Sequence, residues 1–247
     1  MKNFNEHVLD TKEFWNQKIR QWEIGRYKNS NFGGLLEKIA NYSSSSLRQR
    51  LRLSAFILRN HIRSKTIVEV GCGSALMAGW LIDNGAKTYI GYDIAEAAIE
   101  NGKKLYKYSK YGSKIKLICK PIMEMNSLKK CDVIFSLGLL DWLKDEELEK
   151  LFNIGKDAHY LHAISEKRFA TTQFLHRAYV HFSYGFRTNG YVPRYFTVEE
   201  IKSIVNLINT KNMNIYRDRR LSFGALLSSL PLPTKIDLAE IPLFGSS

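Results

Sequence analysis

The chain has 247 residues, of which 45% are hydrophobic and 25% are charged. These proportions are those of an ordinary globular protein and argue against long disordered or fibrous regions. Lysine and arginine together number 37 against 24 aspartate and glutamate residues, which gives a net charge of +13. The surplus favours an anionic partner, such as nucleic acid, an acidic membrane surface or a phosphorylated or carboxylated substrate. A basic surface without a specific use explains it equally well.

The cysteines and the apolar segments indicate in which cellular compartment the protein is expected. Cys72, Cys119 and Cys131 follow no zinc or redox spacing, so we expect reduced thiols. The first residues contain no apolar run of the signal-peptide type, and no stretch is long enough to span a bilayer. We therefore expect a cytoplasmic protein without a transmembrane segment, for which peripheral membrane contact stays open.

Two helical segments come before any strand. Residues 11–27 form the first, and residues 47–62 form an amphipathic helix with arginines on its outer face. The serines at 43–46 are N-cap candidates for this second helix. We expect an N-terminal helical cap over residues 1–63, folded over the cleft of a domain that spans residues 64–247.

Strands and helices alternate from residue 66 onward. Strands are expected at 66–70, 88–92, 114–119, 132–137 and 158–165, with helices at 74–84, 95–106 and 145–153. A later helix at 197–209 starts with a capping box of Thr197 and Glu200, and strands at 213–217 and 221–227 follow it closely. The pattern predicts an α/β, three-layer Rossmann-like sheet that is mostly parallel with an antiparallel last strand.

The most informative stretch is residues 68–75, VEVGCGSA, where a strand passes through a glycine turn into a helix. Gly71 permits the tight turn and Gly73 permits close approach of a ligand to the backbone. The helix that follows offers free N–H groups at its start. Asp93 ends the next strand, 22 residues after Gly71, where an acidic side chain accepts hydrogen bonds from ribose hydroxyls. Together these features predict a site for an adenosine-containing ligand.

Three segments, EVGCGS at 69–74, GYDI at 91–94 and DVIFSL at 132–137, resemble the successive motifs of class I S-adenosylmethionine-dependent methyltransferases. Their order and spacing fit from about residue 66 to residue 143. The late helix and paired strands fit the antiparallel seventh strand of that family. The resemblance implies S-adenosylmethionine as cofactor, with S-adenosylhomocysteine as product. The sequence shows no cluster of metal ligands, so we expect no metal.

The resemblance also implies roles for individual residues. The turn of residues 71–73 would border the methionine part of the cofactor, supported by Glu69. Asp93 would hold the ribose and Ile94 would pack on the adenine, while residues 136–137 would lie near the transferred methyl group. The implied cofactor-binding residues are Glu69, Gly71, Cys72, Gly73, Asp93, Ile94, Ser136 and Leu137.

Two positions depart from the family pattern. Ala75 replaces the third glycine, which would add a methyl group near the cofactor. After the third strand, the acidic residue that often binds the adenine amino group is missing. The adenine edge would then be recognised by backbone groups or by Glu124.

Acceptor-side candidates follow the fourth and fifth strands. Asp141 is a candidate general base or ligand of a substrate hydroxyl, although a carboxylate that starts a helix explains it as well. Residues 166–196 form a long insertion at a position that covers the substrate in this family, and its His176 and His181 are further base candidates. Each of these histidines also fits an ordinary structural role. The candidate substrate-binding residues are Trp142, Tyr184, Arg187, Tyr191 and Arg194.

The remaining candidates carry smaller roles. We interpret His159 and His162 as structural, because they lie within the fifth strand. Trp22, Arg26 and Tyr27 could touch cofactor or substrate from the cap, whereas Trp15 is expected only to pack.

Three functions are compatible with these observations. The first is O-methylation of a small metabolite or a sugar or glycan precursor, for which the arginines would allow an anionic group. The second is an RNA-modifying methyltransferase that uses the basic surface, which predicts salt-sensitive binding. Against it, the tetrad of base-amine methylases is absent after the fourth strand, where SLGL stands at 136–139. The third is a cofactor-binding domain that does not methylate. The sequence does not fix the oligomeric state.

Overall fold

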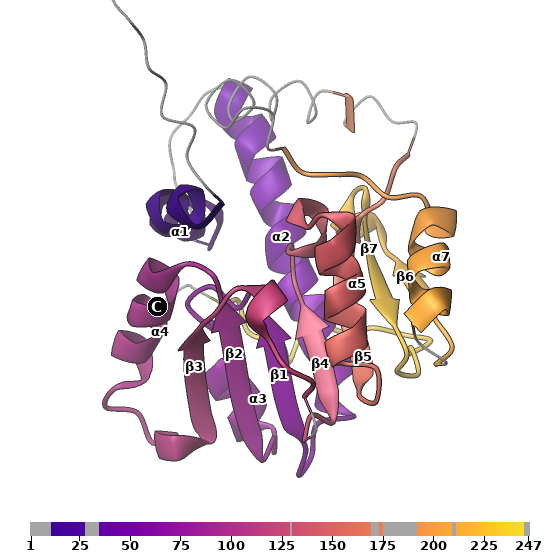
Figure 1. Ribbon diagram of the computed structural model, residues 1–247. Coiled ribbons are helices and arrows are strands. Elements are labelled where there is room, and N and C mark those ends of the chain that lie inside the picture. Colours follow the sequence, from indigo (N-terminus) through magenta and orange to yellow (C-terminus); the bar gives the residue numbers. More distant parts are fainter. Residues whose placement is uncertain are drawn as a thin grey trace, which may run out of the picture.

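The sheet has seven strands in the order β3-β2-β1-β4-β5-β7-β6 (Figure 1). This computed structural model describes residues 11–27, 35–128, 130–168, 173–174, 192–208 and 211–244, without the side chains of 20–27, 35–44 and 205–208. The strands are β1 (Thr66–Val70), β2 (Thr88–Asp93), β3 (Ile115–Cys119), β4 (Val133–Ser136), β5 (His159–Ser165), β6 (Asn214–Arg217) and β7 (Gly224–Ser228). The first five are parallel, and β7 is antiparallel to both β5 and β6. The predicted fold class is confirmed.

Strand β1 is the middle one of the five parallel strands, and its β-branched run TIVEV suits this place because it is buried at four of five positions. It pairs with β2 on one side and with β4 on the other. The chain thus runs outward through β2 and β3, and then returns to add β4 and β5 on the opposite side. This reversal opens a crevice at the carboxyl ends of β1 and β4, where ligands bind in sheets of this type.

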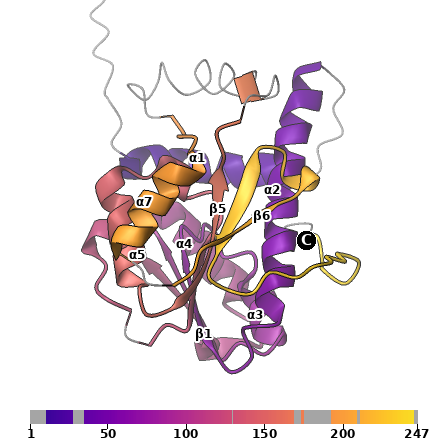
Figure 2. The same cartoon turned by 90° about the vertical axis from the view of Figure 1, so that its right-hand side faces the viewer.

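Helices cover both faces of the sheet (Figure 2). Figure 2 shows α2 (Leu35–Arg59) and α3 (Ala78–Asp83) on one side, with α5 (Asp145–Ile154) and α7 (Val198–Ile208) on the other. Helix α4 (Glu96–Tyr106) adjoins α3, since the Gly79 N–H donates to Tyr106 Oη at 3.2 Å. Helix α1 (Thr11–Tyr27) packs against α2 and α4 near the crevice. The predicted capping box of α7 is present, because Thr197 and Glu200 each accept the other's backbone N–H.

Helix α2 starts earlier than predicted. It begins at Leu35, so the serines at 43–46 lie inside it and do not cap it. The Ser46 hydroxyl instead donates to the Leu221 carbonyl at 2.8 Å, which gives it a tertiary partner. Leu53 and Ile57 of this helix share one core with Ile67 of β1. The boundary between residues 63 and 64 stays a prediction, although the helix before it belongs to the core of the sheet.

Helix α3 starts later than predicted, at Ala78 instead of residue 74. The cause is Ala75, whose φ of +58° lies in the left-handed region and cannot continue a right-handed helix. Its side chain is fully buried in the core and is not part of the crevice lining. The expectation that Ala75 adds a methyl group near the cofactor is therefore wrong.

Candidate cofactor and active site

The glycine turn after β1 is fixed to the end of β2. The N–H groups of Gly71 and Cys72 both donate to the Tyr92 carbonyl, at 2.8 and 3.0 Å. Gly71 has φ +72°, and a Cβ at this position would lie 3.1 Å from Leu139 Cβ. A side chain here would strain the backbone and crowd Leu139 in the loop that follows β4. This explains why the turn requires glycine.

Asp93 connects this turn to α4. Its Oδ2 accepts the Gly73 N–H and its Oδ1 accepts the Ala95 N–H, both at 2.8 Å. Burial raises the pKa of the Asp93 carboxyl, while these backbone donors oppose the rise. Each carboxylate oxygen has a second lone pair. Asp93 can therefore hold the turn and still accept a hydroxyl from a ligand in the crevice.

Glu69 lies beneath the turn and is buried. It accepts a short hydrogen bond from the Tyr89 hydroxyl. Burial and the neighbouring Glu69 charge raise the pKa of Tyr89 well above its ordinary value, so this hydroxyl stays protonated as a donor. The arrangement agrees with a supporting role for Glu69.

The crevice is a pocket of about 1080 Å³, counting the part open to solvent. Its lining contains seven of the eight predicted cofactor-binding residues. These are Glu69, Gly71, Cys72, Gly73, Asp93, Ile94 and Leu137. Ser136 is the exception, because it is fully buried and its Oγ lies 2.9 Å from His162 Nδ1. The chain turns toward the pocket one residue later, at Leu137.

Helix α1 forms the roof of the pocket. Thr11, Trp15 and Ile19 line it, and their spacing of four residues places them on one face of the helix. The Trp15 ring meets that of Trp142 edge to face, with centroids 5.0 Å apart. Trp142 therefore stands where a pocket wall was predicted. Trp15 packs onto the domain, as expected, and it also lines the pocket. The Trp22, Arg26 and Tyr27 side chains lie outside the described residues.

The side of the pocket where the adenine is expected is lined by Ile94, Lys120 and Ile122. The Lys120 N–H donates to the Asp93 carbonyl at 2.8 Å, which ties the end of β3 to the end of β2. Glu124 is exposed and does not line the pocket. Of the two options for the adenine edge, this placement favours backbone groups.

Asp141 is buried behind the pocket wall and does not line the pocket. Its carboxylate accepts the N–H and the hydroxyl of Ser165, both at 2.7 Å, and lies 3.8 Å from Arg50 Nη1. Its carbonyl accepts the Arg194 N–H at 2.6 Å. Burial raises the pKa of the Asp141 carboxyl, while Arg50 and Ser165 oppose the rise. The position suits a carboxylate that joins α2, β5 and the end of the insertion better than a base that meets an acceptor.

The two ends of the 166–196 insertion lie side by side. Glu166 forms a bridge with Phe196, and the Lys167 N–H donates to the Phe196 carbonyl at 2.8 Å. Arg194 pairs with Asp145 at 2.5 Å and stacks over the Phe196 ring, so it does not line the pocket. The remaining insertion candidates lie outside the described residues and stay predictions: His176, His181, Tyr184, Arg187 and Tyr191.

The two histidines of β5 occupy different surroundings. His162 is fully buried, and burial lowers its pKa to about 3. His159 is exposed and its Nδ1 lies 3.3 Å from Ser229 Oγ. Neither residue lines the pocket, which agrees with the structural interpretation.

Comparison with known proteins relates part of the chain to a family. Residues 67–156 match the family described as "Methyltransferase domain". A tRNA U34 carboxymethyltransferase of Actinobacillus succinogenes is 32% identical over 79 residues, which are 32% of this chain and 25% of the relative. The aligned part thus spans a quarter of the length of that relative.

Solved structures share the fold across most of the chain. Magnesium protoporphyrin IX methyltransferase from Synechocystis, with bound S-adenosylhomocysteine, superposes with a TM-score of 0.63 at 14% identity, over 88% of this chain and 96% of the other. The 1,6-didemethyltoxoflavin-N1-methyltransferase of Burkholderia thailandensis, with its substrate and S-adenosylhomocysteine, gives 0.55 at 11% identity, over 89% of each chain.

The strand order, the glycine turn and the acidic residue after β2 define a class I methyltransferase fold. Residues 67–156 carry a methyltransferase domain, and over most of its length the chain has the fold of solved methyltransferases that bind S-adenosylmethionine or S-adenosylhomocysteine. The pocket also fits the cofactor of this class, because it offers lone pairs of Asp93, a glycine-bounded wall and an apolar adenine side in one continuous space.

Proposed function

We propose that the protein transfers the methyl group of S-adenosylmethionine to an oxygen of a small acceptor, either a small metabolite or a sugar or glycan precursor. The observation that supports this function is the roof of the pocket. Trp15 and Trp142 meet directly above it, with Ile19 and Leu143 beside them in the lining. A roofed, aromatic site suits an acceptor that fits inside it better than a segment of a folded macromolecule.

The lining of the pocket supports the proposed cofactor-binding residues. The turn of residues 71–73 would hold the methionine part and Asp93 the ribose, while Ile94 and Ile122 would contact the adenine. Leu137 would border the methyl end, whereas the buried Ser136 would act only through the backbone of β4. S-adenosylmethionine supplies a sulfonium methyl group that is already electrophilic. The main task of the protein is therefore to align the acceptor with it.

An oxygen acceptor also benefits from a general base. His176 and His181 of the insertion stay the proposed bases, because the Asp141 carboxylate already accepts hydrogen bonds from Ser165 and pairs with Arg50. Tyr184, Arg187 and Tyr191 are the proposed acceptor contacts from the same segment, with Trp142 as the pocket wall. Arg194 is not proposed as a contact, because it pairs with Asp145 outside the pocket lining. Arginine would suit an anionic group on the acceptor.

The second candidate function is RNA modification. Two observations favour it: the net charge of +13 and the match to part of a tRNA carboxymethyltransferase. It differs from the first in one measurable respect, since an RNA substrate would bind with strong salt dependence.

Tryptophan fluorescence tests the proposal directly. Titration with S-adenosylmethionine or S-adenosylhomocysteine is expected to change the emission of the wild type and of Trp80→Phe, because Trp80 packs against Phe244 outside the pocket. The change should be much smaller in Trp15→Phe/Trp142→Phe, which lacks both tryptophans of the pocket lining. Calorimetry under the same conditions gives the affinity independently of the fluorophore.

Methyl transfer then separates the two functions. The protein is incubated with labelled S-adenosylmethionine and either a pool of small hydroxylated compounds and sugars or total tRNA. Label in the small-molecule fraction supports the first function, and label in RNA alone would replace it with the second. A folded wild type that binds neither cofactor form would remove both.

A further inference from the structure

The positive charge of the chain is concentrated in one short segment. Residues 101–123 contain seven lysines and no aspartate or glutamate. This segment accounts for more than half of the net charge of +13 in less than a tenth of the chain. A uniformly basic surface would not produce such a concentration.

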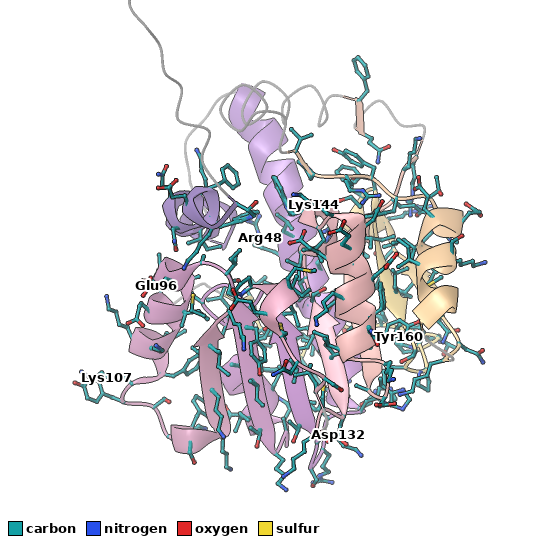
Figure 3. The ribbon with its side chains drawn as sticks, viewed as in Figure 1. Arg48, Glu96, Lys107, Asp132, Lys144 and Tyr160 are labelled. Atoms are coloured by element: carbon teal, nitrogen blue, oxygen red, sulfur yellow. The ribbon has the colours of Figure 1, made fainter. Side chains whose placement is uncertain are left out.

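The fold places this segment at an outer corner. It comprises the end of α4, the turn to the short helix η1 (Gly112–Lys114), and β3, which is one of the two edge strands of the sheet. Figure 3 shows Lys107 projecting from this corner, away from the rest of the protein. Six of its lysines are exposed, namely Lys103, Lys104, Lys107, Lys110, Lys114 and Lys116.

Few carboxylates neutralise these lysines. Lys103 pairs with Glu100 at 2.9 Å and Lys110 pairs with Asp83 at 2.8 Å. The other four take part in no ion pair with any residue that the structure describes. The corner therefore presents an excess of positive charge to solvent.

Two large apolar side chains stand among the lysines. Tyr108 is 89% exposed and Leu105 is 52% exposed. Lys107 Nζ lies 5.0 Å from the centroid of the Tyr108 ring. The neighbouring tyrosines point inward, since Tyr106 donates to the Ala75 carbonyl and Tyr111 to Asp83, each at 2.8 Å. Tyr108 and Leu105 thus present their side chains to solvent between the lysines, whereas Tyr106 and Tyr111 do not.

We propose that this lysine corner, made of the six exposed lysines with Leu105 and Tyr108, docks the protein on the surface of an anionic lipid bilayer. Clustered lysines are attracted to anionic headgroups. Tyrosine and leucine between them can enter the headgroup layer, while the lysine chains extend to the phosphates. None of the helices in the described ranges is long and apolar enough to cross a membrane, so the contact would be peripheral.

The shape and chemistry of the corner favour lipid over other anions. Single-stranded nucleic acid is usually held along a groove with several stacking rings, whereas this is a projecting corner with one exposed ring. Carboxylates of a partner protein are commonly paired by arginine, and residues 101–123 contain none. The inference concerns a surface outside the pocket and does not depend on the identity of the acceptor.

Vesicle flotation tests the proposal with the full chain. Vesicles of phosphatidylcholine alone are compared with vesicles that contain phosphatidylserine, at low and high salt. We expect binding only to the anionic vesicles, with a marked loss at high salt, because the attraction falls off within a Debye length. One lysine near such a surface contributes about fivefold in affinity, so Lys104→Glu/Lys107→Glu should weaken binding at least about 30-fold.

A matched control uses Lys202→Glu/Lys235→Glu, which changes the net charge equally at two exposed lysines far from this segment in the sequence. Leu105→Ser/Tyr108→Ser removes the apolar contribution without a change in charge. Cofactor affinity by calorimetry reports that each variant is folded. The proposal is overturned if the control variant loses as much binding as the corner variant, if neutral vesicles bind equally well, or if single-stranded RNA binds through these lysines while anionic vesicles do not bind.

Discussion

Arg50 of α2 and Asp141, in the turn after β4, bring Nη1 and Oδ2 to 3.8 Å from each other, with each side chain only 7% exposed. Their partner Ser165 ends β5, and the Arg194 backbone binds the Asp141 carbonyl. The pair therefore connects α2 and the end of β5 to the turn that carries Trp142. A buried charge that loses its partner is much more costly than an exposed one.

Replacement of Asp141 should accordingly act on the fold. We expect Asp141→Ala to lower the free energy of unfolding by about 3–5 kcal/mol, because Arg50 would remain charged and buried. Asp145→Ala is the control, since its pair with Arg194 is exposed and should contribute below about 1 kcal/mol. Urea unfolding at pH 7 measures both.

An apolar double variant separates a structural role from a catalytic one. Arg50→Met/Asp141→Leu removes both charges, and much of the stability lost in Asp141→Ala should return. Methyl transfer should return with it, because the proposed base lies elsewhere. If the double variant folds and binds cofactor but transfers no methyl group, Asp141 is a catalytic base after all.

Asp93 should control cofactor affinity. Hydrogen bonds to a charged acceptor contribute about 1.5–3 kcal/mol each, so we expect Asp93→Ala to weaken S-adenosylhomocysteine binding by roughly 100-fold or more. Glu124→Ala is the control, because Glu124 is exposed and outside the pocket lining. Calorimetry provides the measurement, and equal affinities for the two variants would contradict the assigned role.

The pH dependence of the same site has a defined sign. Burial raises the pKa of Asp93, so its carboxylate takes up a proton at a higher pH than an exposed aspartate does. A protonated carboxyl loses acceptor capacity for the ribose. Cofactor affinity should therefore fall as the pH is lowered, and should begin to fall above the ordinary range of aspartate.

The sequence predicted the features that depend on local patterns. Helix α1 has the expected bounds, and the 22-residue spacing placed Asp93 against the glycine turn. Such features follow from helical periodicity, turn chemistry and the geometry of one strand–helix–strand unit. The serines inside α2 show where local signals fail, since residues good at capping also tolerate a helix interior when a tertiary partner such as the Leu221 carbonyl is present.

Features set by distant contacts could not be predicted. Ser136 lies on a fully buried strand, where both faces are apolar and the alternation does not reveal which side chains reach the ligand. Asp141 finds its partner Arg50 on a helix 91 residues earlier in the chain. Trp15 reaches the pocket only because α1 packs across its opening, although the spacing of Thr11, Trp15 and Ile19 gave a signal for one shared face.

Ala75 should behave unlike an ordinary buried alanine. Its left-handed φ costs about 1–2 kcal/mol, which glycine would relieve. Glycine would also lose about 0.8 kcal/mol of methyl burial and about 0.4–1 kcal/mol through the unfolded chain. The opposing effects nearly cancel, so Ala75→Gly should change the free energy of unfolding by less than about 1 kcal/mol. At Ala98, a buried helical position, the same exchange should cost about 1.8 kcal/mol. Equal losses at the two positions would show that the turn is not strained.

His162 should make the protein sensitive to mild acid. Burial lowers its pKa to about 3, whereas in the unfolded chain it titrates near 6.5. As the pH falls below 6.5, the unfolded state binds a proton that the native state does not bind, so stability is lost progressively toward pH 3. Linkage gives a loss of about 2 kcal/mol between pH 7.5 and pH 5 from this residue alone.

His162→Asn tests this origin of the acid sensitivity. Asparagine does not titrate but can still bind the Ser136 hydroxyl. The variant should be less stable at pH 7.5, because it packs less well against Tyr160 and Phe152. Its stability should nevertheless vary about 2 kcal/mol less than that of the wild type between pH 7.5 and pH 5. His159→Asn, at an exposed position, should keep most of the wild-type dependence. Urea unfolding across this pH range decides the matter, and parallel curves for the wild type and His162→Asn would show that His162 does not cause the loss.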